Sequence, residues 1–488
     1  MHANFVNVLA RVKQDKLSAA ALILGFFAVC AYFIQALGMG FWRPDAWGYS
    51  VDELSEFRGS QRWLAPFFHH YLRELPLAVG WICFILGWWV LGYRVAKNYL
   101  GANACWMLAS TVALVFVINP SLIGQSFWPL HSLAALIILL LMDQLRGSVS
   151  KFVLIPVGTV CLYAILQSFA FLTLIFLLPT KKELEVASLG WLLKRGMYDL
   201  SLWVGSLVAG VLVAKLAQLI YFGEITGLLP HRNLRPVATV SDLIGNLIHN
   251  LEVFWHHFLG AYSLFGILTF SVLVFGGVAL IAWKRGDRSG VAKLLAVMAF
   301  YSLPLALGVY LITAPLGSLI SFRSGFGAGC AIFIALLVSQ LVVSDRRFLY
   351  LCMFSLLIPA FGLSYANFKR FSVGTGEIVA TISEFNWRGA DKPNVYIVSS
   401  KAEWPITWEY STRYYPKLYG RYQTAERSKG AFWELGLPEP IWCVNEKRKK
   451  YKGICEELRK PPSANCSKLN SRICVKKIDL QNFVIFID

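Results

Sequence analysis

The side chains best suited to chemistry gather in one stretch, residues 42–74, which lies between two apolar runs. Asp52 and Glu53 are adjacent carboxylates, and either one could act as the general base that takes a proton from a hydroxyl nucleophile. Arg58 and Arg62 follow, four residues apart, a spacing that puts both guanidinium groups on one face of a helix. Arginine holds phosphate through paired hydrogen bonds, so this stretch predicts a base beside an anion site. The alternative is an ordinary solvated loop with interfacial aromatic residues.

Two further cations lie at the edges of apolar runs. Lys215 is near the end of one run, and Arg323 comes just before another. Charged side chains at membrane depth are costly and tend to be functional. A lysine in such a place can also extend its ammonium group to the interface without any further role.

Aromatic side chains are frequent in the last quarter of the chain. Flat rings with polar edges can stack on sugars, although they can equally form a domain core or rest on a membrane. The candidates for binding a glycan are Trp404, Trp408 and Tyr414. No phosphate-binding or dinucleotide-binding glycine motif occurs in a suitable context, so a nucleotide-sugar donor is not supported and a lipid-linked donor suits the setting better.

The elements that position these residues must be apolar. Of the 488 residues, 57% are hydrophobic and 15% are charged, whereas a soluble domain carries about 25% charged residues. This composition excludes disorder, a coiled coil and a collagen-like fibre. The net charge of +18 would indicate nucleic acid in a soluble protein. Here we expect the basic residues to hold cytoplasmic loops against anionic lipid, with the bilayer and no nucleic acid as partner.

Apolar runs predict an α-helical polytopic membrane protein with about eleven membrane segments. The first run is too long for the apolar part of a signal peptide, so we expect it to be retained as a span. The runs are 17–41, 75–92, 102–118, 128–142, 152–178, 197–222, 262–283, 291–314, 325–343 and 348–366.

The run 152–178 determines the topology, because it is long for one helix and short for two full spans. Basic residues collect on the cytoplasmic side of membrane proteins. A single crossing would put Lys181 and Arg195 outside, whereas a hairpin that turns near Gln167 and Ser168 returns them to the inside. We therefore predict a hairpin, counted as two segments, whose short arms are partly wrapped by protein. The N-terminus is then cytoplasmic and the C-terminus lies outside.

This topology predicts two domains. Residues 1–366 form the multi-span membrane domain, with outside loops at 42–74 and 223–261. Residues 367–488 form a small α/β domain on the outer side, where an oxidising compartment favours disulfides. Its two clearest strands are 395–398 and 483–487. Four cysteines allow three pairings, and sequence alone leaves them open: Cys443, Cys455, Cys466 and Cys474.

The stretch 49–53 followed by Arg62-Trp63 resembles the first outside loop of the Gtr-type, serotype-converting O-antigen glucosyltransferases. The pairs Leu162-Tyr163 and Gln167-Ser168 are similar to a Tyr-Gln-Ser-like turn between two short segments in that family. These enzymes belong to the GT-C class of multi-span transferases that use polyprenyl-phosphate sugars. A soluble C-terminal tail also fits the family.

The resemblance implies a GT-C-like fold and an inverting transfer of glucose from undecaprenyl-phosphate glucose to a sugar of lipopolysaccharide O-antigen. The site would face the periplasm, in the bacterial inner membrane. Asp52 or Glu53 would be the base, and the tail would help to bind the acceptor. No cofactor is implied, and although a divalent metal is compatible with the chemistry, no ligand cluster requires one. The donor phosphate would be held by Arg58, Arg62, Lys215 and Arg323.

Three alternatives remain open at this point. A lipid-linked sugar flippase or transporter would need no base at Asp52 or Glu53 and would favour polar residues along a pore. Another GT-C transferase could use a different sugar or acceptor. An O-antigen ligase or polymerase would be expected to carry its largest outside loop between spans rather than as a tail.

Overall fold

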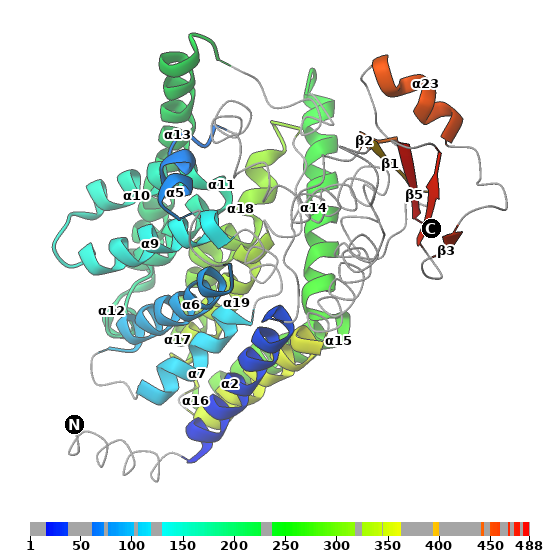
Figure 1. Ribbon diagram of the computed structural model, residues 1–488. Helices are drawn as coiled ribbons and strands as arrows, with labels where there is room; N and C mark the ends of the chain where they lie inside the picture. Colours follow the sequence, from blue (N-terminus) through cyan, green and yellow to red (C-terminus); the bar gives the residue numbers. More distant parts are fainter. Residues whose placement is uncertain are drawn as a thin grey trace. The chain divides into compact units, whose positions relative to one another are not determined.

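The computed structural model describes residues 16–37, 61–72, 77–101, 106–118, 129–225, 237–317, 325–343, 345–362, 394–399, 441–443, 449–458, 467–468, 473–478 and 482–487. Most of these residues are helical (Figure 1). The chain divides into two compact units, one made of Met1–Phe33 and Asp52–Ser364 and the other of Ile34–Val51 and Tyr365–Asp488. The predicted domain boundary after Ala366 stays a prediction.

Three helices in the described part of the chain are long and apolar enough to cross a membrane: Leu189–Phe222, Leu264–Lys284 and Arg288–Thr313. A helix of about 20 residues spans the hydrocarbon core of a bilayer, so the first unit is suited to a membrane. The total of eleven segments stays a prediction. The elements that build these three helices are α13 (Leu189–Phe222), α15 (Leu264–Ser271), η2 (Val272–Gly276), α16 (Gly277–Arg285), α17 (Arg288–Val297), η3 (Met298–Ser302) and α18 (Leu303–Thr313).

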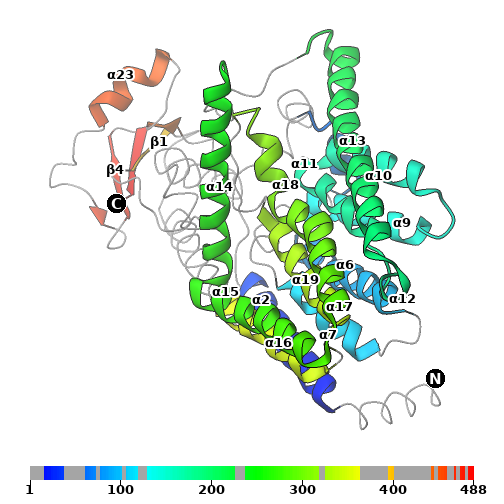
Figure 2. The same cartoon turned by 180° about the vertical axis from the view of Figure 1, so that it is seen from behind.

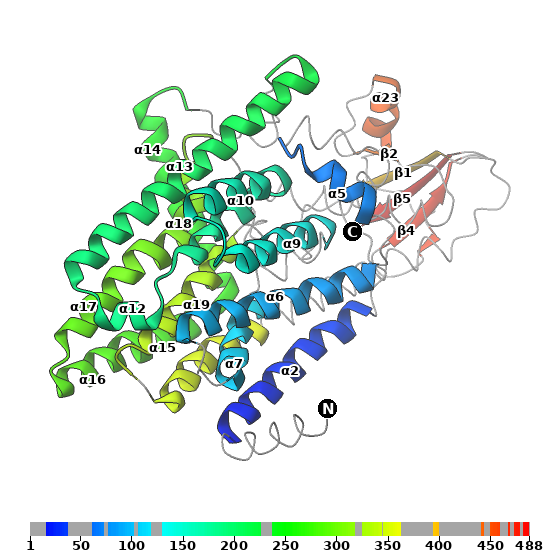
Figure 3. The same ribbon diagram turned by 90° about the vertical axis from the view of Figure 1, so that its left-hand side faces the viewer.

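Shorter helices pack in a series beside α13. α13 lies against α10, α10 against α9, α9 against α6, and α6 against α7, as Figure 3 shows from the side. The helix α19 packs against α7 and α18, and every one of its residues is buried. The bounds of this group are α2 (Lys16–Leu37), α5 (Ala65–Leu72), α6 (Leu77–Leu100), α7 (Trp106–Val117), α9 (Pro129–Leu145), α10 (Lys151–Ile165) and α19 (Gly327–Ser339), with a further helix at 346–362.

The chain breaks and reverses at Leu166, directly after α10. The backbone of Leu166 is extended, with φ −155° and ψ 107°, so it cannot continue the helix. Two short elements follow, α11 (Gln167–Ala170) and the 3-10 helix η1 (Phe171–Leu177). The break lies next to Gln167 and Ser168, where the charge pattern predicts a turn.

Hydrogen bonds show that the two arms run back along each other. The hydroxyl groups of Thr159 and Thr173 lie 2.9 Å apart, one on each arm. At the base, Arg146 Nη2 donates to the carbonyl of Leu178 at 3.1 Å, so the chain ends its return close to where α10 began. A segment that crossed once would place Leu178 at the far end of the bundle from Arg146. The predicted hairpin is therefore confirmed.

The returning arm is enclosed by protein, as its short length requires. All residues from Phe169 to Leu178 are buried. Trp203 of α13 donates its indole N–H to the carbonyl of Phe171 at 3.2 Å, and a Cβ added to Gly308 would lie 3.0 Å from both aromatic side chains. Irregular backbone at membrane depth is tolerated only where protein satisfies its polar groups, and these contacts meet that condition.

A long helix, α14 (Val240–Tyr262), occupies much of the range 223–261 that we expected as an outside loop. Thr239 and Asp242 form a capping box that begins it. Asn250 then donates to the carbonyl of Tyr310 at 2.8 Å and joins α14 to α18. The chain changes direction between α14 and α15 (Figure 2). The range was expected to be a loop because it lies between two apolar runs, whereas polar side chains such as Asn250 hold α14 to α18.

The second unit contains a five-stranded sheet. β1 pairs in parallel with β2 and β5, whereas β4 pairs antiparallel with β5 and β3, which gives the order β2-β1-β5-β4-β3. The two strands predicted from apolar runs, β1 and β5, are confirmed, and they lie side by side over their full length. The elements are β1 (Asn394–Ser399), β2 (Ile441–Trp442), α23 (Lys449–Leu458), β3 (Ser467–Lys468), β4 (Ile473–Lys477) and β5 (Asn482–Ile487).

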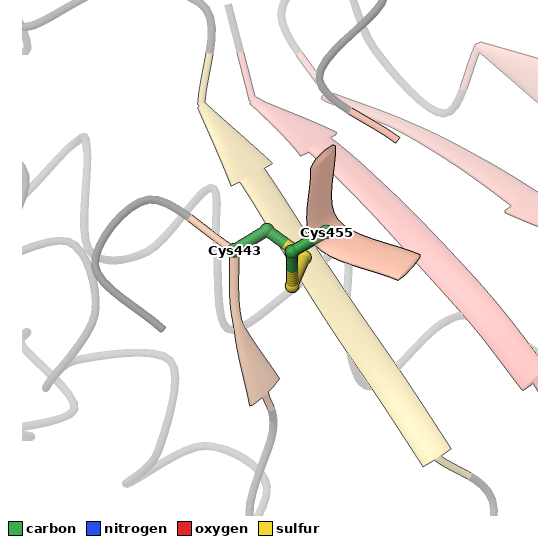
Figure 4. Close-up of a disulfide and its surroundings, with 2 residues drawn as sticks. All are labelled: Cys443 and Cys455. Carbon is green, nitrogen blue, oxygen red and sulfur yellow. A yellow bond between two sulfur atoms is a disulfide. The ribbon is translucent and has the colours of Figure 1, made fainter. Parts of the chain in front are cut away.

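A disulfide joins the sheet to its helix. Cys443 at the end of β2 is bonded to Cys455 on α23 (Figure 4). Both sulfurs are buried in the small core formed with Tyr396, Ile441 and Val484. This selects one pairing from those that the sequence allowed, and Cys466 lies outside the described residues.

Candidate functional site

Two of the nine predicted site residues, Arg62 and Lys215, are among those that the structure describes. The predicted base and the predicted glycan platform are outside the described residues. The seven predicted residues outside the described ranges are Asp52, Glu53, Arg58, Arg323, Trp404, Trp408 and Tyr414.

Arg62 lies at the tip of the hairpin. Its side chain is buried, with 6% of the residue exposed, and Nε donates to Oε1 of Gln167 at 3.4 Å. The backbone supports this contact, because the amide of Leu64 donates to the carbonyl of Ala164 at 3.1 Å. Arg62 of the first-loop motif and Gln167 of the hairpin motif therefore meet, although 105 residues separate them in the sequence.

The residue before Arg62 has a strained backbone. Gln61 is buried and has φ +63°, in the left-handed region that costs a non-glycine residue about 1 kcal/mol. The amide of Ala65 donates to the carbonyl of Arg62 at 3.1 Å and closes a tight turn that begins α5. Strain of this kind persists where surrounding contacts fix the backbone, and it is concentrated at functional sites.

The residues that follow these two partners in the sequence each contribute a buried polar atom. Ser168 Oγ follows Gln167, and Trp63 Nε1 follows Arg62; both are shielded from solvent and have no hydrogen-bond partner within the described ranges. A buried donor without a partner costs about 1–3 kcal/mol, so native proteins keep few of them. The tip of the hairpin thus combines a buried guanidinium group with unused hydrogen-bonding capacity.

Lys215 lies on the C-terminal half of α13, at the same end of the bundle as the hairpin tip. Gly210 of α13 packs against Tyr163 of α10, where an added Cβ would lie 3.2 Å from the tyrosine Cβ. Tyr163 is three residues before the break at Leu166, and Lys215 is about 8 Å farther along α13 than Gly210. Lys215 is partly exposed. The structure therefore puts this predicted cation near the level of the hairpin tip.

A third segment, directly before α19, also packs at the hairpin tip. Phe326, the residue before α19, packs on Phe169 of α11 with ring centroids 4.8 Å apart. Arg323 precedes Phe326 by three residues, although Arg323 itself lies outside the described ranges. The chain three residues after Arg323, the fourth predicted phosphate ligand, thus packs at the hairpin tip.

The opposite end of the hairpin holds a buried ion cluster that the sequence analysis missed. Asp199 of α13 is fully buried, and its carboxylate accepts hydrogen bonds from Lys151 at 2.8 Å, Tyr301 at 2.8 Å and Arg195 at 3.4 Å. These groups come from three separate parts of the chain and leave both carboxylate oxygens satisfied. An acid within an apolar run, four residues after an arginine, was the signal that could have identified the cluster.

Glu183 extends this cluster outside the spans. It accepts a hydrogen bond from Arg195 at 2.7 Å and caps the short helix α12 (Lys181–Val186) through Thr180. Burial by itself would raise the pKa of Glu183, but the hydrogen bonds from Arg195 and Thr180 outweigh it, so the pKa lies below its ordinary value. At neutral pH the residue is therefore a carboxylate that holds the base of the hairpin.

Basic residues from several segments meet at this base. Arg94 of α6 pairs with Asp143 of α9 and donates to Gln144 at 2.7 Å. Lys293 of α17 donates to the carbonyl of Leu184 at 2.9 Å. Arg146 and Lys151 lie at this base too. These contacts bring together, at one end of the bundle, the helix ends that the distribution of basic residues assigned to one side of the membrane. That this side is the cytoplasm stays a prediction.

Within the described ranges, no three histidine, cysteine, aspartate or glutamate side chains gather closely enough to hold a metal ion. Comparisons of the chain with protein-family models, with curated proteins and with solved structures give no match. What the site does must therefore be argued from its own geometry.

Proposed function

We propose that the protein is an inverting glycosyltransferase of the bacterial inner membrane that moves a sugar, glucose by the resemblance, from undecaprenyl phosphate to O-antigen on the periplasmic side. The observation that supports this proposal best is the contact of Arg62 with Gln167. Through this contact Arg62, which the resemblance implies binds phosphate, lies at the tip of a buried hairpin. The hairpin belongs to a helical bundle that is suited to a membrane.

The arrangement suits a lipid-linked phosphate. The hairpin tip is at the end of the bundle opposite the ion cluster, and Lys215 lies near the same level. A donor whose chain stays in the bilayer would present its phosphate at that depth. A buried guanidinium group in a low-dielectric setting stabilises charge that grows on a leaving phosphate more strongly than one in water.

The reaction needs one displacement. An acceptor hydroxyl oxygen attacks the anomeric carbon and forms the new glycosidic bond. The bond from that carbon to the phosphate oxygen breaks, and the electron pair leaves on polyprenyl phosphate. Asp52 or Glu53 takes the hydroxyl proton. Because phosphate is a good leaving group, no protein acid has to protonate it, and a single displacement inverts the anomeric centre.

The disulfide supports the proposed location of the tail. Cys443 and Cys455 are bonded within the second unit, and structural disulfides form in oxidising compartments such as the periplasm. With an outer C-terminal unit, the acceptor glycan and the aromatic residues Trp404, Trp408 and Tyr414 are on one side of the membrane.

The test is the transfer of labelled sugar from a polyprenyl-phosphate donor to O-antigen in membranes that contain the full chain. We expect the wild type to transfer and one of two variants, Asp52→Asn or Glu53→Gln, to lose transfer while it still inserts normally. A wild type that transfers no sugar, or two variants that both match it, would contradict the proposal and favour a lipid-linked sugar flippase.

A further inference from the structure

Two buried donor groups at the hairpin tip have no hydrogen-bond partner among the described residues. Ser168 Oγ and Trp63 Nε1 are shielded from solvent without partners within the described ranges, and each is adjacent in sequence to one partner of the Arg62–Gln167 hydrogen bond. We propose that Ser168 and Trp63 donate hydrogen bonds to the phosphate of the lipid-linked donor beside Arg62, and that Gln167 is a positioning residue that orients the guanidinium group. This inference rests on the proposed function and deepens it.

The chemistry of the three groups selects the ligand. An indole N–H and a guanidinium group can only donate hydrogen bonds, and a serine hydroxyl can donate one. A single group that accepts from both unsatisfied donors must be rich in acceptors, and the cation beside them favours a negative charge. Phosphate oxygens meet both conditions, whereas a metal ion or a neutral apolar ligand meets neither.

Gln167 is suited to orient Arg62 without competing for it. Its Oε1 accepts from Nε of Arg62 at 3.4 Å, and as a neutral amide it leaves the positive charge of the guanidinium group in place. A carboxylate at position 167 would form an ion pair with Arg62 and oppose an anionic ligand. The hydrogen bond therefore orients Nε of Arg62 and does not neutralise the guanidinium charge.

The direct test is binding of a short-chain polyprenyl phosphate, which carries no sugar, to the detergent-solubilised full chain. We expect Ser168→Ala to weaken binding roughly tenfold, because a hydrogen bond to a charged group is lost. Trp63→Phe should weaken it several-fold for the same reason. Ser206→Ala is the matched control, since Ser206 is also buried but donates to the carbonyl of Leu202 in its own helix at 2.7 Å.

A structural role and a binding role give opposite results. Ser168→Ala removes a buried hydroxyl without a partner, so its melting temperature should be no lower than that of the wild type. A variant that melts earlier but binds the probe as the wild type does would overturn the proposal. Equal affinity of the wild type for a polyprenyl alcohol of the same length would overturn it too, because the phosphate would then not be recognised.

The role of Gln167 has a signature in pH. Gln167→Glu should bind the probe more weakly than the wild type at pH 7. The ratio of the two affinities should approach one as the pH falls below about 4, because the ion pair with Arg62 keeps the new carboxyl charged until then. A ratio that does not change with pH would contradict the positioning role. Since the probe has no sugar, altered binding without any transfer would refute the proposed function alone, and normal transfer with unaltered binding would refute this inference alone.

Discussion

The two ends of the hairpin differ in how far their buried polar groups are satisfied. At the base, Asp199 accepts hydrogen bonds from Lys151, Arg195 and Tyr301, so its charge is matched by two cations. At the tip, Arg62 meets the neutral amide of Gln167, and buried donors beside it lack partners within the described part of the chain.

This difference separates stability from binding. A buried carboxylate costs several kcal/mol to desolvate and is kept only when charges and hydrogen bonds compensate it. The base meets this requirement within the fold itself. The tip leaves hydrogen-bonding groups without partners among the described residues and keeps a strained backbone at Gln61. A fold selected for stability alone would retain neither feature. We therefore assign structural integrity to the base and ligand recognition to the tip.

The largest effect on stability is expected at the base. Asp199→Asn would leave Lys151 and Arg195 without their shared carboxylate and should destabilise the protein by about 3 kcal/mol. The value lies at the lower end for a buried pair because the Lys151 side chain is 41% exposed. Thermal unfolding in detergent measures the loss. Probe binding by the molecules that stay folded should be unchanged, and a fall in their affinity would break the division between the two ends.

A smaller effect should follow pH at Glu183. Its pKa in the folded protein lies below its ordinary value, so it adds stability above its unfolded pKa, and that stability is lost as pH falls through the folded pKa. The side chain is 43% exposed, which limits the contribution to about 0.2–1 kcal/mol. The wild type should therefore lose more of its melting temperature between pH 7 and pH 4 than Glu183→Gln does. Equal losses would show that the pair with Arg195 contributes nothing.

The hairpin shows how much charge patterning can predict. Its apolar run fits neither one span nor two, and only the basic residues after it, such as Lys181 and Arg195, required the chain to return. The structure confirms the return through Thr159 and Thr173. The strands β1 and β5 could also be predicted from the sequence, because a short apolar run between polar segments is typical of a buried strand.

Long-range contacts could not be predicted in the same way. The sequence marked Arg62 and Gln167 separately, but no spacing rule connects residues that lie 105 positions apart. The helix α14 was not predicted, because the range 223–261 lies between two apolar runs and was assigned as a loop. In the structure, Asn250 and His257 of this helix both bond to Tyr310 of α18. Polar residues that bond across helices cannot be distinguished by type from those that face water.

The measurement that tests the account most directly compares two arginines that each donate to the hairpin. Arg62 contacts its tip, and Arg146 contacts the carbonyl of Leu178 at its base. Sugar transfer per folded molecule should fall roughly hundredfold in Arg62→Gln, as expected when one group that stabilises transition-state charge is removed. Arg146→Gln should keep the rate within about twofold while it loses stability. Transfer by Arg62→Gln at the wild-type rate would contradict the account.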